Sequence, residues 1–163
     1  MVYIGLGANL GDPAATFGKA LRQLSALPAY RERARSSLYG SAPVGGPPQP
    51  DYYNLVVAAC YRGSPSCLLK RLGEIETLHG RQRRVVNGPR TLDLDILIFG
   101  RETVNLPDLI IPHPRLAERA FVLLPLLELA PELPVPGYEQ TVTRLWENMD
   151  PRLKREQRIE RIA

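Results

Sequence analysis

Residues 81–99 read RQRRVVNGPRTLDLDILIF, a run of arginines followed by a Gly-Pro turn and a strand that carries two aspartates. Over Thr91–Phe99, apolar side chains alternate with Asp93 and Asp95, which is the pattern of a strand with one buried face. Residues two apart on a strand lie roughly 6.5 to 7 Å apart, so both carboxylates can face the same cations above the sheet. The alternation places on the opposite, buried face Leu92, Leu94, Ile96 and Ile98.

The two aspartates are accompanied by arginines rather than by histidine or cysteine, which indicates a hard cation and a phosphate. Mg²⁺ takes one or two carboxylates together with phosphate oxygens, and arginine presents a planar fork that matches a phosphate. An Asp-x-Asp pair alone is more often a solvated strand face beside a basic loop. Here the turn and the arginines favour a site for Mg²⁺ and a nucleotide phosphate; those arginines are Arg81, Arg83, Arg84 and Arg90.

Length and composition predict one globular domain that spans residues 1–163. Hydrophobic side chains make up 44% of the 163 residues, which is ordinary for a single core of this size. The net charge of +4 and the pI near 9.3 favour acidic partners, a class that includes both nucleic acid and ATP. The sequence begins without a charged leader, and no apolar run approaches the roughly 18 residues that span a bilayer. We therefore expect a cytoplasmic protein with no membrane partner.

The order of the predicted elements indicates an α+β fold with a ferredoxin-like split β-α-β core and a mostly antiparallel sheet covered by helices. Apolar strands are predicted at residues 2–7 and at Tyr52–Tyr61, the second of them in the centre of the sheet. Asp12 and Ser64 each precede a proline and predict the starts of two helices. Residues 30–42, between the first helix and the central strand, predict one polar edge strand.

The C-terminal part of the chain carries weaker signals. Thr103–Leu106 predicts a further edge strand, and Arg115–Ala130 predicts a helix that is interrupted at Pro125. A last helix is expected from about Gln140, with Trp146 in the core rather than in a site.

A longer motif overlaps the arginines and the aspartates. The segment Asn87–Leu97, NGPRTLDLDIL, resembles the signature of the 6-hydroxymethyl-7,8-dihydropterin pyrophosphokinase family of folate biosynthesis. The resemblance extends from Tyr3–Gly11, YIGLGANLG, to Ala130–Leu133, and its motifs follow the family's order. It implies that a hydroxymethylpterin hydroxyl attacks the β-phosphorus of ATP, that AMP leaves, and that the pterin keeps a diphosphate. It also implies two Mg²⁺ ions that hold the triphosphate.

The same resemblance implies roles for the nucleotide side of the site. Asp93 and Asp95 would bind Mg²⁺, and Arg81 and Arg90 would neutralise the transferring group, for which charge stabilisation matters most. The resemblance also places Glu76 among the ATP-binding residues, although Glu76 lies off the apolar stripe of its helix. The full set of expected ATP-binding residues is Glu76, Arg83, Arg84, Ile96, His113 and Arg119.

For the pterin, the resemblance implies a pocket of two flat walls and a polar edge. Tyr52 and Phe121 would stack on the ring, and Asn54 would offer the donor and acceptor that its edge requires. Asn87 stands where many relatives carry an aromatic lid residue, so lid closure is expected to differ. The expected pterin-binding residues are Ser41, Pro43, Val44, Tyr52, Asn54 and Phe121.

Two other functions use the same features. A ferredoxin-like sheet with a basic pI suits an RNA-binding module, but no RNA-recognition aromatic run appears on a predicted strand, and an Asp pair without metal repels phosphate. A metal-dependent nucleotidyl transferase or nuclease could use the same carboxylates at an α-phosphorus or a diester. Pyrophosphate release would favour the transferase. Formation of AMP only with a pterin would favour the pyrophosphokinase, whose expected partners are ATP and a hydroxymethyl-dihydropterin, not nucleic acid.

Overall fold

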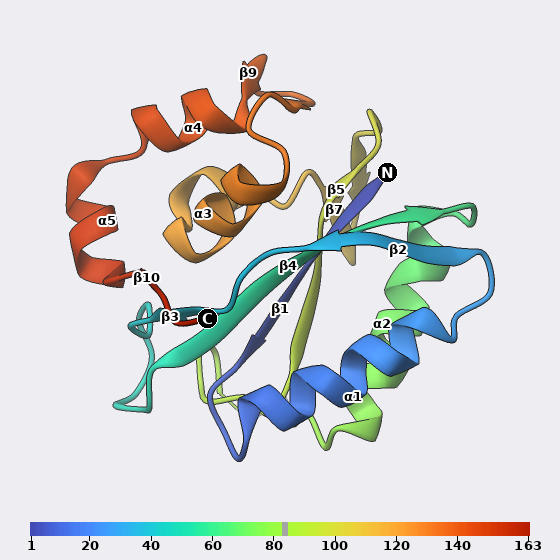
Figure 1. Ribbon diagram of the computed structural model, residues 1–163, viewed down its shortest axis with the longest axis horizontal. Coiled ribbons are helices and arrows are strands. Elements are labelled where there is room, and N and C mark those ends of the chain that lie inside the picture. Colours follow the sequence, from blue (N-terminus) through green and yellow to red (C-terminus); the bar gives the residue numbers. More distant parts are fainter. Residues whose placement is uncertain (83–84) are drawn as a thin grey trace.

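The main sheet has the strand order β10-β3-β4-β1-β5, with β2 also paired to β4, in the computed structural model, which describes residues 1–82 and 85–163 (Figure 1). Each of these pairings is antiparallel. Because β1 lies between β4 and β5, the sheet has the split β-α-β arrangement that was predicted. The strands of this sheet are β1 (Val2–Ala8), β2 (Tyr30–Arg35), β3 (Tyr39–Ser41), β4 (Tyr52–Tyr61), β5 (Asp93–Phe99) and β10 (Glu160–Arg161).

Helices cover the two faces of the sheet, with α1 and α2 on one face and α3 to α5 on the other (Figure 1). Asp12 accepts a hydrogen bond from the Ala15 amide at 3.1 Å, and Ser64 accepts one from the Cys67 amide at the same distance. Both predicted helix starts are thereby confirmed. The helices are α1 (Pro13–Ser25), α2 (Pro65–Leu78), a 3₁₀ turn (Leu116–Glu118), α3 (Ala120–Leu129), α4 (Val142–Asn148) and α5 (Pro151–Gln157).

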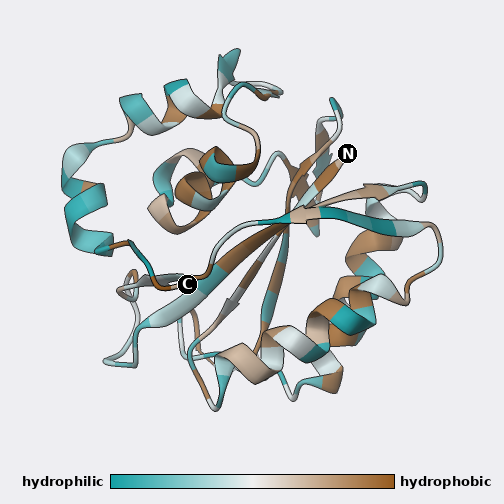
Figure 2. Cartoon of the chain, viewed as in Figure 1, coloured by the Kyte–Doolittle hydropathy of each residue, from teal (hydrophilic) through white to brown (hydrophobic). Residues whose placement is uncertain are grey.

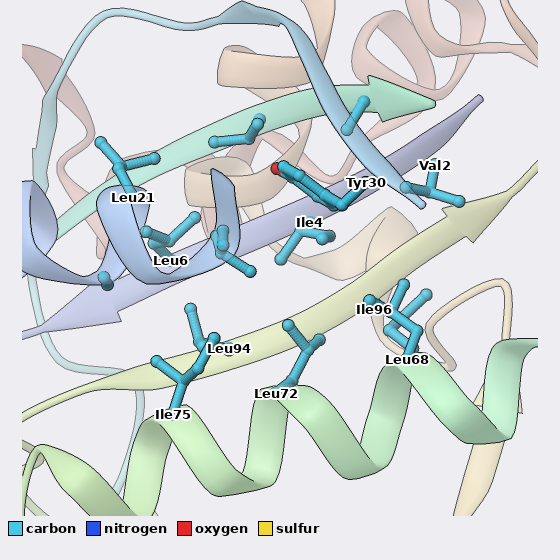
Figure 3. Packing of buried hydrophobic residues seen from close by; sticks show 14 of the residues in the cluster. Val2, Ile4, Leu6, Leu21, Tyr30, Leu68, Leu72, Ile75, Leu94 and Ile96 are labelled. Carbon is cyan, nitrogen blue, oxygen red and sulfur yellow. The ribbon is translucent and has the colours of Figure 1, made fainter. Parts of the chain in front are cut away.

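Each face of the sheet has its own hydrophobic cluster. Figure 3 shows the first, where Leu94 of β5 lies beside Ile75 of α2 and Ile96 lies beside Leu68. The second cluster joins β4 and β5 to α3 and α4. Figure 2 shows that polar residues gather on β2, at the edge of the sheet, and on the outer turns of α4 and α5. The site described below opens on the α3 side, because Asp93 and Asp95 alternate with the residues that face α2.

The alternation in β5 breaks near its end. The register to β1 shifts between Tyr3 and Ile4, which pair with Ile98 and Ile96, so Leu97 forms a bulge. Both Leu97 and Ile98 consequently pack in the cluster on the α3 side. The prediction that Ile98 shares a face with Ile96 was wrong, because a bulge reverses the alternation of all later residues.

Other predicted strands also differ from the structure. Residues 30–42 form two strands, β2 and β3, which pair with successive parts of β4. The predicted edge strand at Thr103–Leu106 does not join the main sheet; β6 (Val104–Leu106) pairs with β7 (Leu109–Ile111) in a separate hairpin. A second small hairpin joins β8 (Pro134–Val135) to β9 (Gln140–Thr141).

The C-terminal helices break at places that the sequence pattern did not indicate. Pro125 lies inside α3, whereas the break comes at Arg119, between the 3₁₀ turn and α3. The expected last helix is two short helices, α4 and α5. Trp146 is only partly buried, and the Lys154 ammonium lies 4.2 Å from the centre of its ring. None of the helices in residues 1–82 and 85–163 has the length and apolar character needed to cross a membrane.

Glu128 ties α3 to the strand β3, and this contact makes stability depend on pH. Its carboxylate accepts hydrogen bonds from Tyr39 Oη at 2.8 Å and from Ser37 Oγ at 2.9 Å. Partial burial raises the pKa of Glu128, but these hydrogen bonds outweigh it, so the net pKa is lowered. A lowered pKa in the folded state stabilises the protein above the ordinary glutamate pKa, and that contribution is lost as the pH falls through the folded value.

We therefore expect Glu128→Gln to lower the free energy of unfolding by about 0.5 kcal/mol at pH 7, a small value because the group is solvent-screened. The deficit should shrink as the pH falls below about 4. Urea unfolding of the parent and the variant, at pH 7 and at a pH below about 4, measures this deficit, with the exposed Glu132→Gln variant as the control. A deficit that stays equal at both pH values would contradict this role for the charge.

Candidate active site

A pocket opens on the α3 side of the sheet, between the strand ends, the loop after β3 and the start of α3. The strands β1, β4 and β5 supply its floor, where Asp93 and Asp95 face the same space as Asn54. Most residues predicted from the sequence are brought together here. Those that line the pocket are Ser41, Val44, Tyr52, Asn54, Asn87, Arg90, Asp93, Asp95, Arg119 and Phe121.

The remaining predicted residues lie in other places. Arg81 pairs with Asp93 and with Glu76 of α2, and His113 lies beside Asp95. Pro43 does not line the pocket, although its neighbours Ala42 and Val44 do. Ile96 is buried against α2 on the opposite face of β5, so only its backbone could contact a nucleotide bound near the aspartates. Arg83 and Arg84 lie outside the described residues.

Asp93 is held between two arginines. Arg81 Nη1 lies 2.9 Å from Asp93 Oδ1 and also pairs with Glu76, while Arg90 pairs with Asp93 Oδ2. Despite the close arginine, Asp93 Oδ1 is buried without a well-aligned hydrogen bond. A buried carboxylate oxygen that lacks a proper donor is costly. This oxygen is therefore satisfied only by the ion pair with Arg81, and a metal bound here would have to displace that guanidinium.

Asp95 is the more exposed carboxylate of the pair and has weaker partners. Arg119 Nη1 lies 3.5 Å from Asp95 Oδ2, and His113 Nε2 lies 3.8 Å from the same oxygen. Surrounding protein and the nearby Asp93 raise the pKa of Asp95 to about 7, against the opposing effect of Arg119. The side chain remains 35% exposed towards the pocket. Asp95 is therefore only partly neutralised by its neighbours, and the carboxylate pair favours the binding of a further positive charge.

The proton of His113 can be assigned from its contacts. Its Nδ1 accepts a hydrogen bond from the Arg115 amide at 3.1 Å. Burial, and then the neighbouring Arg119, lower the pKa of His113 to about 4, so the ring is neutral near pH 7. A neutral ring that accepts at Nδ1 carries its proton on Nε2. The 3.4 Å approach of Arg119 Nη1 to Nε2 is therefore no hydrogen bond, and Nε2–H is available to donate.

Glu76 is buried, with 5% of its surface exposed, although the sequence placed it off the apolar stripe of α2. Its Oε1 accepts a hydrogen bond from the Leu94 amide at 2.7 Å and pairs with Arg81. Burial raises the pKa of Glu76, partly offset by the Leu94 amide and by Arg81. Glu76 therefore anchors β5 and holds Arg81 next to Asp93.

The residues predicted to bind the pterin, apart from Pro43, bring both apolar and polar groups to the same pocket. Asn54 Nδ2 donates to Ser41 Oγ at 2.9 Å, and both residues are buried. Tyr52 Oη donates to the Gly88 carbonyl at 2.8 Å, which ties the ring to the arginine-containing loop. The Arg119 guanidinium lies 5.5 Å from the centre of the Phe121 ring, a cation–π distance.

Three polar residues that the sequence did not single out hold the loops together or line the pocket. Asn9 Oδ1 accepts from the Arg90 amide at 2.9 Å, and Asn9 Nδ2 donates to Gln49 Oε1 at 3.0 Å. Gln49 Nε2 in turn donates to the Asn87 carbonyl at 2.8 Å. Arg115 also lines the pocket. Asn9 lies in the YIGLGANLG motif, which was the available signal; nothing local marks Gln49.

The two loops approach so closely that one position needs glycine. Gly46 has φ +75°, and a Cβ there would lie 2.3 Å from the Asn87 carbonyl oxygen. Asn87 has φ +54°, a left-handed conformation that asparagine tolerates better than most residues.

The fold and the site together define a class of protein: an α+β domain that presents a carboxylate pair and several arginines to a phosphate ester beside an aromatic pocket. A family described as 7,8-dihydro-6-hydroxymethylpterin-pyrophosphokinase matches residues 3–131. The chain is similar to the 2-amino-4-hydroxy-6-hydroxymethyldihydropteridine pyrophosphokinase of Pseudomonas aeruginosa, at 46% identity over 83% of each chain. The Haemophilus influenzae protein of the same name is 42% identical over 88% of this chain and 89% of its own length.

A solved structure agrees on the fold. The Plasmodium falciparum HPPK-DHPS protein with pterin and p-hydroxybenzoate superposes with a TM-score of 0.72 at 17% identity, over 99% of this chain. This chain spans 46% of that longer protein, so it corresponds to about half of it.

The chain belongs to the 7,8-dihydro-6-hydroxymethylpterin-pyrophosphokinase family. It is an ATP-dependent enzyme that transfers a pyrophosphoryl group to hydroxymethyldihydropterin in folate synthesis. The reaction implied by the NGPRTLDLDIL resemblance is thereby confirmed, and the RNA-binding and nucleotidyl-transfer alternatives are set aside.

Proposed function

We propose that Asp93 and Asp95 hold two Mg²⁺ ions together with the ATP phosphates. The observation that carries the proposal is that both carboxylates face one pocket, into which Asp95 keeps 35% of its side chain exposed. Within residues 1–82 and 85–163, no cluster of three or more His, Cys, Asp or Glu could hold a metal by itself. A two-carboxylate site completed by phosphate oxygens suits Mg²⁺. When bound, the ions would neutralise the triphosphate and polarise the β-phosphoryl group.

Arg81 and Arg90 would stabilise the charge of the transferring group. In the reaction a bond forms between the pterin hydroxyl oxygen and the β-phosphorus, the bond from that phosphorus to the α,β-bridging oxygen breaks, AMP leaves with that oxygen, and the hydroxyl proton is released. Both arginines pair with Asp93. With Asp93 holding a metal, at least one of the two guanidinium groups would be available to the phosphates, where a bidentate arginine is most effective.

The other expected ATP contacts divide into direct and supporting ones. His113 Nε2–H and the Arg119 guanidinium point at Asp95 and would donate to phosphate oxygens. Glu76 supports Arg81 and the Leu94 backbone.

The pterin would occupy the apolar part of the pocket, with Tyr52 and Phe121 against its ring faces. Asn54 Nδ2 donates to Ser41 Oγ, and the Asn54 carbonyl oxygen has no hydrogen-bond partner among residues 1–82 and 85–163. The Asn54–Ser41 pair can therefore form hydrogen bonds with the polar edge of the ring. Ala42 and Val44, rather than Pro43, would contribute the third wall. We also propose that the whole chain, residues 1–163, acts as one domain, since β10 pairs with β3 next to this wall.

Asn87 replaces an aromatic lid residue, and restoring the ring is expected to slow pterin release. In Asn87→Trp an added stacking contact would lower the pterin dissociation rate by about two- to tenfold, with little change in the chemical step. Stopped-flow pterin fluorescence measures the rate. Asn87→Gly is the matched control, because it relieves φ +54° without adding a ring. An unchanged rate in Asn87→Trp would remove this position from the lid.

The number of metal ions can be counted directly. Mn²⁺ titration followed by electron paramagnetic resonance, with an α,β-methylene ATP analogue bound, is expected to give two ions per chain. One ion would contradict the two-metal proposal. AMP formation from ATP and Mg²⁺ should also require 6-hydroxymethyl-7,8-dihydropterin.

A further inference from the structure

Gln157 is a buried polar residue that lies beyond the residues matched by the family, which end at 131. It is the last residue of α5 and only 2% exposed. Its Oε1 accepts a hydrogen bond from the Ala120 amide at 2.7 Å, and its Nε2 donates to the Glu118 carbonyl at 2.8 Å. Its backbone carbonyl accepts from the Ala42 amide at 2.8 Å. The amide orientation follows from these partners, a donor and an acceptor.

These contacts connect two walls of the pterin pocket. Ala120 is the first residue of α3 and precedes Phe121, while Ala42 follows Ser41 in the loop after β3. Helix α3 has no local cap, because Arg119 makes no side-chain hydrogen bond to its first turn. An uncapped amide at a buried helix start needs another acceptor. Gln157 supplies that acceptor from a distant segment of the chain.

We propose that Gln157 is a positioning residue for the pterin substrate, which it serves by fixing the start of α3 and the loop at Ala42 relative to each other. The inference rests on the proposed function, since it assumes that Phe121 and Ser41 contact the pterin.

The effect should fall on the pterin more than on ATP. The Arg119 guanidinium is held by Asp95 at 3.5 Å, and Asp93 and Asp95 lie on β5, to which Gln157 makes no hydrogen bond in the described part of the chain. Phe121 and Ala42 adjoin or contain backbone atoms that Gln157 bonds. Arg119 also lies between two such residues, Glu118 and Ala120, but its guanidinium is held in addition by Asp95.

Gln157→Leu removes both side-chain hydrogen bonds at similar volume. We expect its Kd for 6-hydroxymethyl-7,8-dihydropterin, measured by calorimetry with the methylene ATP analogue bound, to rise roughly tenfold, and its Kd for the analogue to change less than about twofold. Gln157→Glu keeps the acceptor for Ala120 but replaces the donor to the Glu118 carbonyl by a second oxygen, so it should also weaken pterin binding. Glu156→Leu, the adjacent exposed change on α5, is the control and should match the parent. All binding assays are run well below the midpoint temperature of unfolding of each variant, so that the protein is folded.

The outcomes separate the inference from the proposed function. Both the role of Gln157 and the pocket assignment are supported if Gln157→Leu and Phe121→Ala each weaken pterin binding and the double variant shows less than the sum of the two effects. If Phe121→Ala weakens pterin binding but Gln157→Leu and Gln157→Glu do not, the role of Gln157 is overturned and the pocket assignment stands. The role of Gln157 is also overturned if its variants lower the unfolding temperature and leave pterin binding unchanged. If Phe121→Ala leaves pterin binding unchanged, the pocket assignment is overturned, and so is the inference about Gln157 that depends on it.

Discussion

Asp95→Ala is expected to abolish measurable turnover, with kcat reduced by roughly 10³-fold or more, while the protein remains folded. The loss follows from the several kcal/mol of charge stabilisation that a catalytic metal provides. Asp95 points into the pocket rather than into a hydrophobic cluster, so its removal leaves no buried cavity. AMP formation at saturating Mg²⁺ measures the effect, with Asp108→Asn, an exposed aspartate between β6 and β7, as control.

Stability measurements sharpen this test. Burial and Asp93 raise the pKa of Asp95 to about 7, so the folded protein binds a proton there more tightly than the unfolded chain does. Without metal, that difference lowers stability as the pH rises from about 4 to 7. Asp95→Asn should therefore be inactive and yet unfold in urea at the same concentration as the parent or at a higher one. Near-normal activity of either variant at saturating Mg²⁺ would show that Asp95 does not bind the metal.

The sequence predicted those parts of the fold that depend on neighbouring residues. The caps at Asp12 and Ser64 and the apolar strand β4 depend on residues within a few positions of each other, and they are found as expected. The bulge at Leu97 depends instead on pairing with β1, which lies far away in sequence. A period-two pattern contains no information about such a shift, which explains why Ile98 was placed on the wrong face.

The same distinction applies to the site. Asp93, Asp95 and Arg90 are adjacent in one motif, so their convergence could be predicted. Glu76 could not be recognised as buried, because its partners are the Leu94 amide and a guanidinium outside its helix. Asn9 and Gln49 are linked by a hydrogen bond across 40 positions. Bonds of this kind arise only once the sheet has brought the loops together.

Arg90→Ala is expected to lower kcat by roughly 10³-fold with a much smaller change in the KM for either substrate, because a well-placed arginine acts mainly on the transferring phosphoryl group. The backbone of Arg90 is held independently of its side chain. Its amide donates to Asn9 Oδ1 at 2.9 Å, and its carbonyl accepts from the Asn9 amide at 3.0 Å. Truncating the side chain therefore leaves the loop attached, and a change in rate can be assigned to the guanidinium.

Arg81 offers no comparably clean test. Its guanidinium neutralises Glu76, which is buried, so Arg81→Ala leaves an uncompensated charge and should destabilise the protein by about 3 to 5 kcal/mol. Arg90→Lys is the informative companion: it keeps the charge but loses the planar fork, and should recover only part of the rate. Arg101→Ala, an exposed arginine in the turn after β5, is the control. If Arg90→Ala raises the KM for ATP while kcat stays near the parental value, Arg90 binds the nucleotide and does not stabilise the transferring pyrophosphoryl group.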